Sequence, residues 1–265
     1  MLAFRDFITA FRKLEIDSSR PVIVHSSLSA FGQVQGGADT LLGALCSAFD
    51  SLIMPTFTYK TMVIPEVGPA NNGISYGRGR STNHTAEIYY PDMPADRMMG
   101  ILAETLRTHP KVFRSSHPIL SFAGLNAMPI LASQSIKEPL SPIQLMVDQD
   151  GWVLLLGVDH VVNTSIHYAE RLAGRKQFVR WALTPDGIIP CQGFPGCSQG
   201  FEQINPYLEN VVHKVEIGAA VMQAIPLVNL VGVVCDLLKN NPLALLCERE
   251  DCERCNEVRA SVIAS

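Results

Sequence analysis

The sequence lacks the long apolar runs and the basic excess that mark two large classes of protein. No uninterrupted apolar span reaches about eighteen residues, the length that a membrane-crossing helix needs, and the N-terminus has no signal-peptide pattern. The net charge of −4 at pH 7 gives no sign of a nucleic-acid partner. We therefore expect a soluble, cytoplasmic protein whose partners are small molecules, with no membrane and no nucleic acid among them.

Charged residues are also scarce, and no internal repeat, low-complexity tract or clear linker is present. Only 17% of the 265 residues are charged, whereas 47% are hydrophobic. This composition predicts one globular domain over residues 1–265 with ample core. Seven cysteines, an odd number, argue against a disulfide framework and favour reduced thiols.

The order of the predicted elements indicates an α/β fold. An amphipathic helix over 2–15 is followed by a short strand over 21–24, a helix over 40–49 and a strand over 51–55. This strand-helix-strand order predicts a mainly parallel sheet that is covered on both faces. A hairpin with its turn at 184–187 is expected to add antiparallel strands to one edge of that sheet.

The segment 151–170 groups several titratable residues near the end of a predicted strand. Its apolar run predicts a buried strand, the loop after it contains His160, and the next helix carries His167 and Glu170 three residues apart on one face. Open α/β sheets bind ligands at the carboxyl ends of their strands. The segment is therefore a candidate active site, and the alternative is a surface helix with an incidental His-Glu pair.

Six of the seven cysteines lie in the last third of the chain, and five of them are candidate metal ligands. Cys252 and Cys255 form a Cys-x-x-Cys pair, Cys247 precedes it, and Cys191 and Cys197 lie in a loop rich in glycine and proline. Tetrahedral zinc sites favour thiolate pairs at this spacing. Two interpretations stay open: a structural zinc ion, or reduced thiols buried as small apolar residues.

Several segments, taken in order, resemble the aminoglycoside 3-N-acetyltransferase family, and the likeness covers roughly residues 5–262. These segments are His25-Ser-Ser-Leu-Ser29, Met54-Pro-Thr-Phe-Thr58, Met99-Gly-Ile-Leu-Ala-Glu104, Arg114-Ser-Ser-His-Pro118, Ser141-Pro142, Asn163-Thr-Ser-Ile-His-Tyr-Ala-Glu170, Gly196-Cys-Ser-Gln-Gly-Phe201 and the Cys-x-x-Cys pair. The resemblance implies a three-layer α/β/α sandwich around a mainly parallel mixed sheet. It also implies transfer of an acetyl group from acetyl-coenzyme A to an amine of an aminocyclitol antibiotic.

The resemblance further implies roles for individual residues. His167 is expected to be the general base, which Glu170 orients unless it lies in the amine pocket, and His160 ranks second as a base. Residues expected to bind coenzyme A are Ser26, Ser27, Leu28, Ser29 and Thr164. Residues expected to bind the acceptor are Glu104, Tyr59 and His117. A structural zinc ion is expected on Cys197, Cys247, Cys252 and Cys255, with Cys191 as the alternative to Cys247.

Two features depart from the family pattern. The segment 57–94 is longer than usual, polar and aperiodic, so we expect it to form part of the acceptor pocket. Leu140 stands before the Ser-Pro pair, where many members have histidine. The acceptor could therefore be another amino sugar, or the chain could be a coenzyme A-binding protein without turnover.

Overall fold

Three apolar strands lie parallel at the centre of the main sheet. In the computed structural model, which describes residues 1–263, β1 (Val22–Ser26) pairs in parallel with β2 (Leu52–Pro55) on one side and β6 (Trp152–Leu156) on the other. The helix α2 (Gly37–Ala48) connects β1 to β2. The predicted strand-helix-strand unit is confirmed, and it places the carboxyl ends of three strands side by side.

The outer strands of this sheet run antiparallel to their neighbours. The seven strands follow the order β4-β5-β2-β1-β6-β10-β9. The outer ones are β4 (Val112–Arg114), β5 (Phe122–Leu125), β9 (His213–Ile217) and β10 (Ala220–Pro226). The sheet is therefore mixed, with its parallel pairing at the centre, where the strands are buried on both faces.

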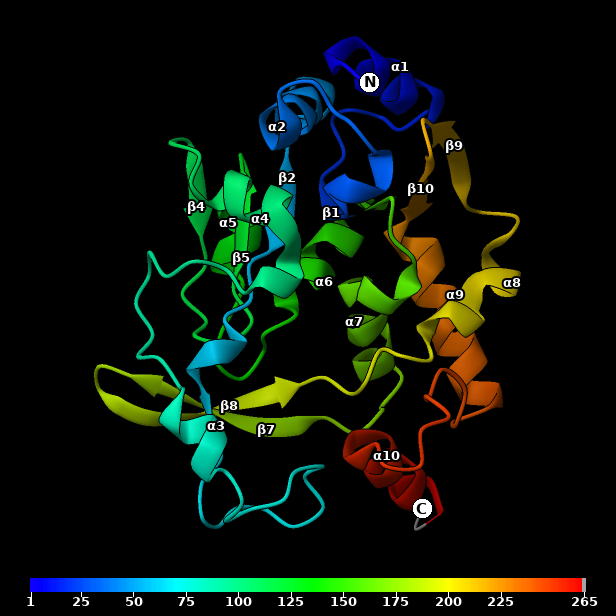
Figure 1. Cartoon of the computed structure of the whole chain (residues 1–265). Coiled ribbons are helices and arrows are strands. Elements are labelled where there is room, and N and C mark those ends of the chain that lie inside the picture. Colours follow the sequence, from blue (N-terminus) through cyan, green and yellow to red (C-terminus); the bar gives the residue numbers. More distant parts are fainter. Residues whose placement is uncertain (264–265) are drawn as a thin grey trace.

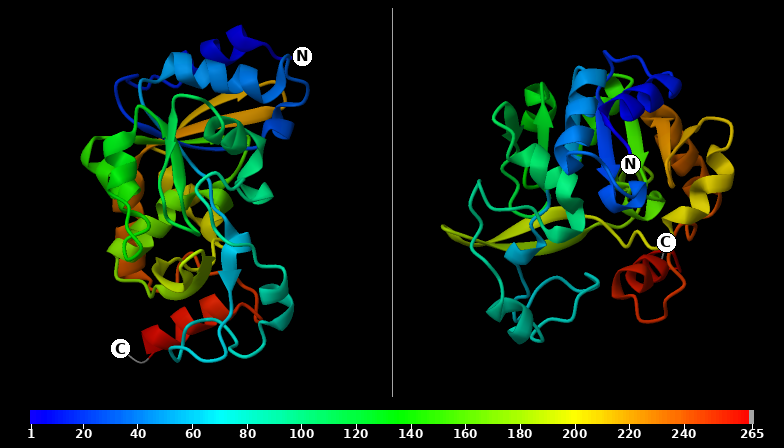
Figure 2. Two further views of the ribbon diagram at one scale, coloured as in Figure 1. Left: turned by 90° about the vertical axis from the view of Figure 1, so that its left-hand side faces the viewer. Right: turned by 45° about the horizontal axis from the view of Figure 1, so that its top comes forward.

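Helices cover both faces of the sheet, as Figures 1 and 2 show. Successive side chains of β1 point to opposite faces of the sheet, and both faces are apolar. Val22 and Val24 belong to one hydrophobic cluster, and Ile23 belongs to the other. The first cluster includes residues of α1 (Phe4–Lys13), α2 and α4 (Gly100–Arg107). The second includes residues of α5 (Met128–Ala132), α6 (Ser141–Asp148), α7 (Thr164–Leu172) and α9 (Leu227–Asn240). The predicted three-layer α/β/α architecture is confirmed.

The predicted hairpin forms, but its predicted place was wrong. Strands β7 (Phe178–Thr184) and β8 (Gly187–Phe194) pair with β3 (Met62–Val63) in a separate three-stranded sheet. The edges of the main sheet are instead formed by β4 and β9. Figure 1 shows the small sheet below the main one, next to the segment 56–94.

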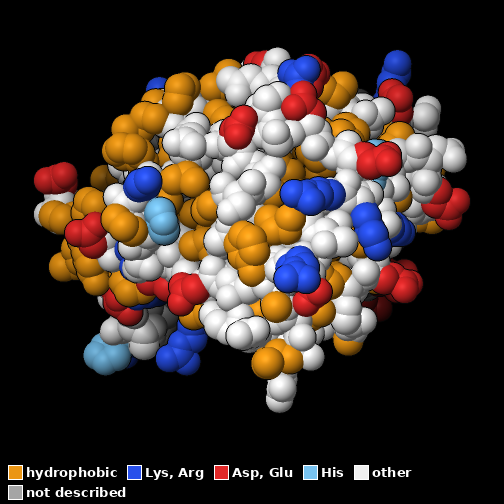
Figure 3. All heavy atoms as spheres, turned by 90° about the horizontal axis from the view of Figure 1, so that it is seen from above, with side chains coloured by type: hydrophobic (Ala, Val, Ile, Leu, Met, Phe, Trp, Pro, Cys, Tyr) orange, Lys and Arg blue, Asp and Glu red, His pale blue; other side chains and the backbone are white. Residues whose placement is uncertain are grey.

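Several short elements were not predicted from the sequence. They are η1 (Leu28–Phe31), η2 (Tyr59–Thr61), α3 (Arg80–His84), η4 (His160–Val162) and α10 (Glu253–Ile263). Three further short helices are η3 (Arg97–Met99), which precedes α4, and η5 (Phe201–Ile204) and α8 (Asn205–Leu208), which follow β8. Within residues 1–263, no helix combines the length and the apolar character that crossing a membrane requires. On the face in Figure 3, acidic and basic side chains are interspersed among hydrophobic ones.

Candidate active site

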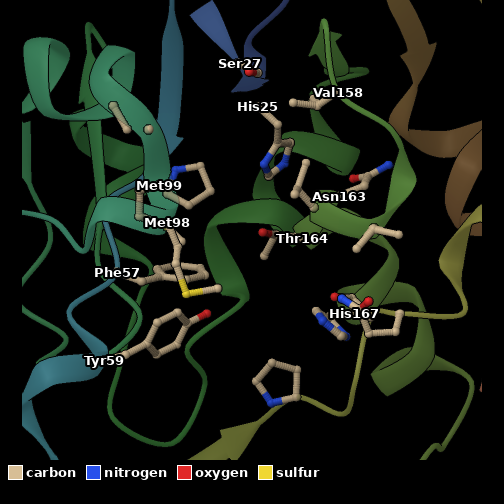
Figure 4. Close-up of a pocket in the computed structure, with 18 of the residues that line it drawn as sticks. His25, Ser27, Phe57, Tyr59, Met98, Met99, Val158, Asn163, Thr164 and His167 are labelled. Atoms are coloured by element: carbon tan, nitrogen blue, oxygen red, sulfur yellow. The ribbon is translucent and has the colours of Figure 1, made fainter. Parts of the chain in front are cut away.

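A cavity of about 1400 Å³ opens at the carboxyl ends of the parallel strands. The end of β1 and the loop after it line one side, and the first turns of α7 line another. The far end is lined by the loop after β8 and by residues 249–254. Figure 4 shows side chains from several of these segments around the same space. The predicted location of the site at the strand ends agrees with this geometry.

A buried chain of charged groups holds His167 in the cavity wall. The Nδ1 atom of His167 lies 2.8 Å from Oε2 of Glu170, and Nη1 of Arg175 lies 2.5 Å from the other carboxylate oxygen. Glu170 is only 2% exposed and does not line the cavity. Arg175 also donates to the carbonyl groups of Pro242 and Ala244. Glu170 therefore orients the imidazole and lies outside the cavity lining.

This arrangement fixes the tautomer of His167. A carboxylate paired with a guanidinium only accepts hydrogen bonds, so Nδ1 of His167 carries the proton that it donates to Glu170. The Nε2 atom then has a free lone pair while the ring is neutral. Since His167 lines the cavity, this lone pair is available to a proton on a bound molecule. The ring packs edge-on against Phe201, with centroids 4.7 Å apart.

The predicted second base, His160, lies behind the cavity wall. It is fully buried and is not among the lining residues. Its Nδ1 atom lies 3.2 Å from Nδ2 of Asn163, and its backbone N–H donates to Glu202. Burial lowers the pKa of His160, an effect that the charges of Glu202 and Asp159 oppose. The ring is therefore in no position to act on a ligand directly.

The segment predicted to bind coenzyme A lines the cavity opposite the far end. Ser26, Ser27, Leu28, Ser29 and Thr164 all border it. A helix leaves its first N–H groups without acceptors inside the helix, and in η1 these groups belong to Leu28 and Ser29. The Oγ atoms of Ser27 and Ser29 lie 3.1 Å apart. The structure thus gathers backbone N–H groups and hydroxyls at one end of the cavity.

A glycine after β6 lets the chain pass close to this segment. Gly157 has φ +68°, and a Cβ atom there would lie 2.6 Å from the Cβ atom of Ala30 in η1. Only glycine adopts this positive φ readily and also leaves room for η1, because it has no Cβ atom. This close approach keeps the loop that leads to α7 beside the loop that follows β1.

Only one of the three residues predicted to bind the acceptor lines the cavity. That residue is Tyr59, whose pKa burial raises to about 12 even though Arg254 acts in the opposite sense, so its hydroxyl stays protonated. Glu104 instead accepts hydrogen bonds from Arg107 at 2.6 and 2.8 Å and from the N–H of Ala95. His117 accepts two backbone N–H groups in the turn that leads to β5. These two side chains hold the local backbone and lie outside the cavity lining.

Four of the cysteines converge where the C-terminal segment meets the loop after β8. The sulfur atoms of Cys197, Cys247, Cys252 and Cys255 all lie within 4.8 Å of one another. Cys191 is not part of this cluster; it is buried on β8, and burial raises the pKa of its thiol to about 12. Four thiolates around a tetrahedral zinc ion are separated by about 3.8 Å, given Zn–S bonds of about 2.3 Å. The cluster has the ligand type, number and approximate spacing of such a site.

Sequence reasoning missed three arginines of the site. Arg175 lies beyond the end of α7, so helical spacing from Glu170 could not place it beside that carboxylate. Arg180 on β7 and Arg254 on α10 line the far end of the cavity, where their guanidinium groups lie 5.1 and 5.9 Å from the ring centroid of Phe194. No sequence pattern connects these distant segments.

Comparison with known proteins agrees with the geometry. The family model described as aminoglycoside 3-N-acetyltransferase matches residues 23–239. Aminoglycoside N(3)-acetyltransferase III from Salmonella sp. is 28% identical over 238 residues, which cover 77% of this chain and 80% of the relative. Aminoglycoside N(3)-acetyltransferase VII from Streptomyces paromomycinus is 34% identical over 166 residues, or 60% of this chain and 57% of the relative.

A solved structure agrees with the fold over almost the whole chain. The apoenzyme of aminoglycoside acetyltransferase AAC(3)-IVa superposes with a TM-score of 0.80 and 24% identity, covering 98% of both chains. The family model spans most of this chain, and the fold, the strand-end cavity and the His-Glu pair are all in place. The chain therefore belongs to the aminoglycoside 3-N-acetyltransferase family, a family of enzymes.

Proposed function

We propose that this enzyme transfers the acetyl group of acetyl-coenzyme A to an amine of an aminoglycoside or a related amino sugar. The observation that carries this proposal is the buried His167-Glu170-Arg175 chain, which faces a cavity bordered by residues 26–29. Two fold neighbours add support. One is the acetyltransferase AAC-IIIb with CoASH, and the other is a histidine-to-alanine mutant of AAC(3)-IVa in complex with a gentamicin.

In the proposed reaction, His167 makes the acceptor amine nucleophilic. An ammonium group has no lone pair with which to attack a thioester, so the acceptor reacts as the neutral amine, and its nitrogen must lose one further proton as it forms its bond to the carbonyl carbon. The Nε2 atom of His167 takes this proton, and Glu170 stabilises the imidazolium that results. The tetrahedral intermediate then breaks its carbon–sulfur bond, and the imidazolium returns the proton to the departing thiolate. General-base help of this kind typically contributes about 10²–10⁴-fold.

The donor is proposed to bind at the β1 end of the cavity. The hydroxyl groups of Ser26, Ser27, Ser29 and Thr164 would contact the pantetheine arm. Backbone N–H groups at the start of η1, among them that of Leu28, would face the thioester carbonyl. A preorganised donor of this type stabilises a developing oxyanion by about 3–4 kcal/mol.

The charges at the far end of the cavity favour an acceptor with few positive charges. Arg180 and Arg254 both line this end, and both donate hydrogen bonds to backbone carbonyl groups. The lining carboxylates are Asp251, which pairs with Arg249, and Glu253. A related amino sugar that also carries an acidic group is therefore the second candidate acceptor, beside a polycationic antibiotic.

The first prediction concerns turnover itself. Purified enzyme with acetyl-coenzyme A and a panel of amines should release free thiol with at least one aminoglycoside or amino sugar. The panel should include antibiotics and acidic amino sugars, and calorimetry should measure coenzyme A binding separately. Coenzyme A binding without thiol release from any amine would favour the alternative, a binding protein without turnover. If coenzyme A does not bind, the proposal fails.

The second prediction concerns the base. His167→Ala should lower kcat by at least about 10²-fold, because no other side chain takes the amine proton. Glu170→Gln should lower kcat less, since it keeps the size of the side chain but loses the charge that stabilises the imidazolium. His109→Ala, which changes a partly exposed histidine just after α4 and outside the cavity lining, is the control. Normal turnover in the His167 variant would assign the base elsewhere.

The third prediction concerns the long segment 57–94, which we propose forms part of the acceptor pocket. Asn72 ties this segment to β7 through two hydrogen bonds with the backbone of Val179, next to Gly73 in the cavity wall. Asn72→Ala should therefore raise KM for the acceptor more than KM for acetyl-coenzyme A.

A matched control for this experiment lies in the same segment. Asn83 makes two similar hydrogen bonds with the backbone of Ile64, outside the cavity lining. Asn83→Ala should leave the ratio of the two KM values unchanged. Equal effects of Asn72→Ala on both substrates would reduce the segment to a structural role.

The fourth prediction concerns the cysteine cluster, which we propose binds a structural zinc ion. With four protein ligands the ion would have no open position for water, so it would fasten the C-terminal segment without taking part in acetyl transfer. Protein purified without chelator should contain about one zinc ion per chain. Cys252→Ser should lower both the zinc content and the melting temperature, because zinc binding stabilises the folded state.

The control for the zinc proposal is a buried cysteine outside the cluster. Cys191→Ser should leave the zinc content unchanged, since Cys191 lies on β8 away from the four sulfur atoms. Metal-free protein whose melting temperature does not respond to added zinc would contradict the proposal.

A further inference from the structure

A second histidine faces the cavity, and the proposed reaction above does not use it. His25 is the fourth residue of β1, lines the cavity and is 7% exposed. Figure 4 shows its ring between Ser27 and Thr164, with His167 farther along the same wall. The donor is proposed to bind on this side. His25 is therefore placed beside the thioester, while His167 is placed beside the amine.

The Nε2 atom of His25 is buried and has no hydrogen-bond partner, and the same is true of the Nε2 atom of His160. The two rings are close enough to interact electrostatically. Burial, and secondly the neighbouring His160, lower the pKa of His25 to about 3. His25 is therefore neutral at any pH at which the enzyme would work, and one of its two nitrogens carries a proton.

The hydrogen bonds of Asn163 determine which nitrogen of His160 carries its proton. Asn163 caps α7, because its Oδ1 atom accepts the N–H of Ser165 at 3.1 Å. Its amide nitrogen is then the group 3.2 Å from Nδ1 of His160, and it donates. Since Nδ1 of His160 accepts, the proton of this neutral ring is on Nε2.

The same argument extends to His25. A protonated Nε2 atom of His160 needs an acceptor, and the Nε2 atom of His25 can accept through one bridging water molecule, since neither atom has a partner within hydrogen-bond distance. The proton of His25 is then on Nδ1. Because the Nε2 side of the ring is buried, the Nδ1 side is the one that reaches the cavity.

We propose that His25 is a further catalytic residue, which donates a neutral Nδ1–H hydrogen bond to the thioester oxygen, and that His160 and Asn163 are positioning residues that fix its tautomer. The inference rests on the proposed acetyl transfer. No proton is transferred by His25: as the amine attacks, negative charge develops on the thioester oxygen, and the N–H group stabilises it until the carbon–sulfur bond breaks.

The surroundings of His160 agree with this assignment. Glu202 and Asp159 are the acidic groups near the ring, and Lys214 and His25 are the basic ones. Glu202 accepts the backbone N–H of His160 rather than a ring proton. The ring nitrogens of His160 are thus left to Asn163 and His25. A positioning role therefore explains why His160 lies close to the site in the sequence but is buried behind the cavity wall in the fold.

Two amide substitutions test which nitrogen of His25 matters. Asparagine places its amide group near the Nδ1 position of histidine, whereas glutamine places it near the Nε2 position. His25→Asn should retain kcat within about tenfold of the wild type, while His25→Gln and His25→Leu should lower kcat by about 10²–10³-fold, the effect of losing one oxyanion donor. KM for acetyl-coenzyme A should change little. Rescue by glutamine and not asparagine, or full activity of the leucine variant, would overturn the proposal.

Nuclear magnetic resonance of histidine-labelled enzyme reads the tautomer without any turnover. The ring nitrogen and carbon shifts of His25 should report a neutral Nδ1–H form between pH 5 and 9. In Asn163→Asp, the new carboxylate keeps the cap on α7 but can only accept, so His160 should move its proton to Nδ1 and His25 should change to the Nε2–H form.

These spectra separate the failure of the inference from the failure of the proposed function. An Nε2–H form of His25 in the wild type, or a ring that titrates between pH 5 and 9, would overturn the inference even if the enzyme acetylates amines. An Nδ1–H form in an enzyme that releases no thiol with any amine would instead contradict the proposed acetyl transfer, and with it the catalytic role of His25.

Discussion

The geometry of the site depends on a buried carboxylate. Glu170 is almost fully buried, so its charge is tolerable only because Arg175 pairs with one oxygen and His167 donates to the other. Removing one partner of a buried ion pair leaves an uncompensated charge, which costs about 3–5 kcal/mol. Arg175 also holds the carbonyls of Pro242 and Ala244, so the same interaction connects α7 to the chain beyond α9. The position of His167 is thereby set by the packing of two distant segments.

The periodic elements near the site could be predicted from the sequence, and the contacts between remote segments could not. The apolar run of β6 and the spacing of His167 and Glu170 depend only on neighbouring residues, and both appear as expected. Glu104 shows the opposite case. Its family motif suggested an amine ligand, but Arg107 lies three residues away on the same helix and takes the carboxylate. The three-residue spacing of Glu104 and Arg107 on one helix is typical of an ordinary ion pair and could have been recognised in the sequence.

The hairpin and the cysteines illustrate the same limit. Local turn residues predict that β7 and β8 pair, but only the packing of the whole chain decides that they join β3 and not the main sheet. The Cys-x-x-Cys spacing predicts half of a metal site. Its completion by Cys197 and Cys247 depends on a contact between the C-terminal segment and the loop after β8. Without the resemblance to the family, the sequence offers Cys191 as a zinc ligand on equal terms with Cys197 and Cys247.

The two ends of the cavity are built in different ways, and this separates the chemistry from the choice of acceptor. The end proposed to bind the donor consists of strand termini and the turns after them, which the buried parallel strands hold in place. The end proposed to bind the acceptor consists of segments outside the main sheet: the hairpin, the segment 57–94 and the residues around the cysteine cluster. Changes in these outer segments can alter the shape and charge of the acceptor pocket without moving β1, β6 or α7. An enzyme built in this way can therefore keep one acetyl-transfer mechanism while its amine substrate changes.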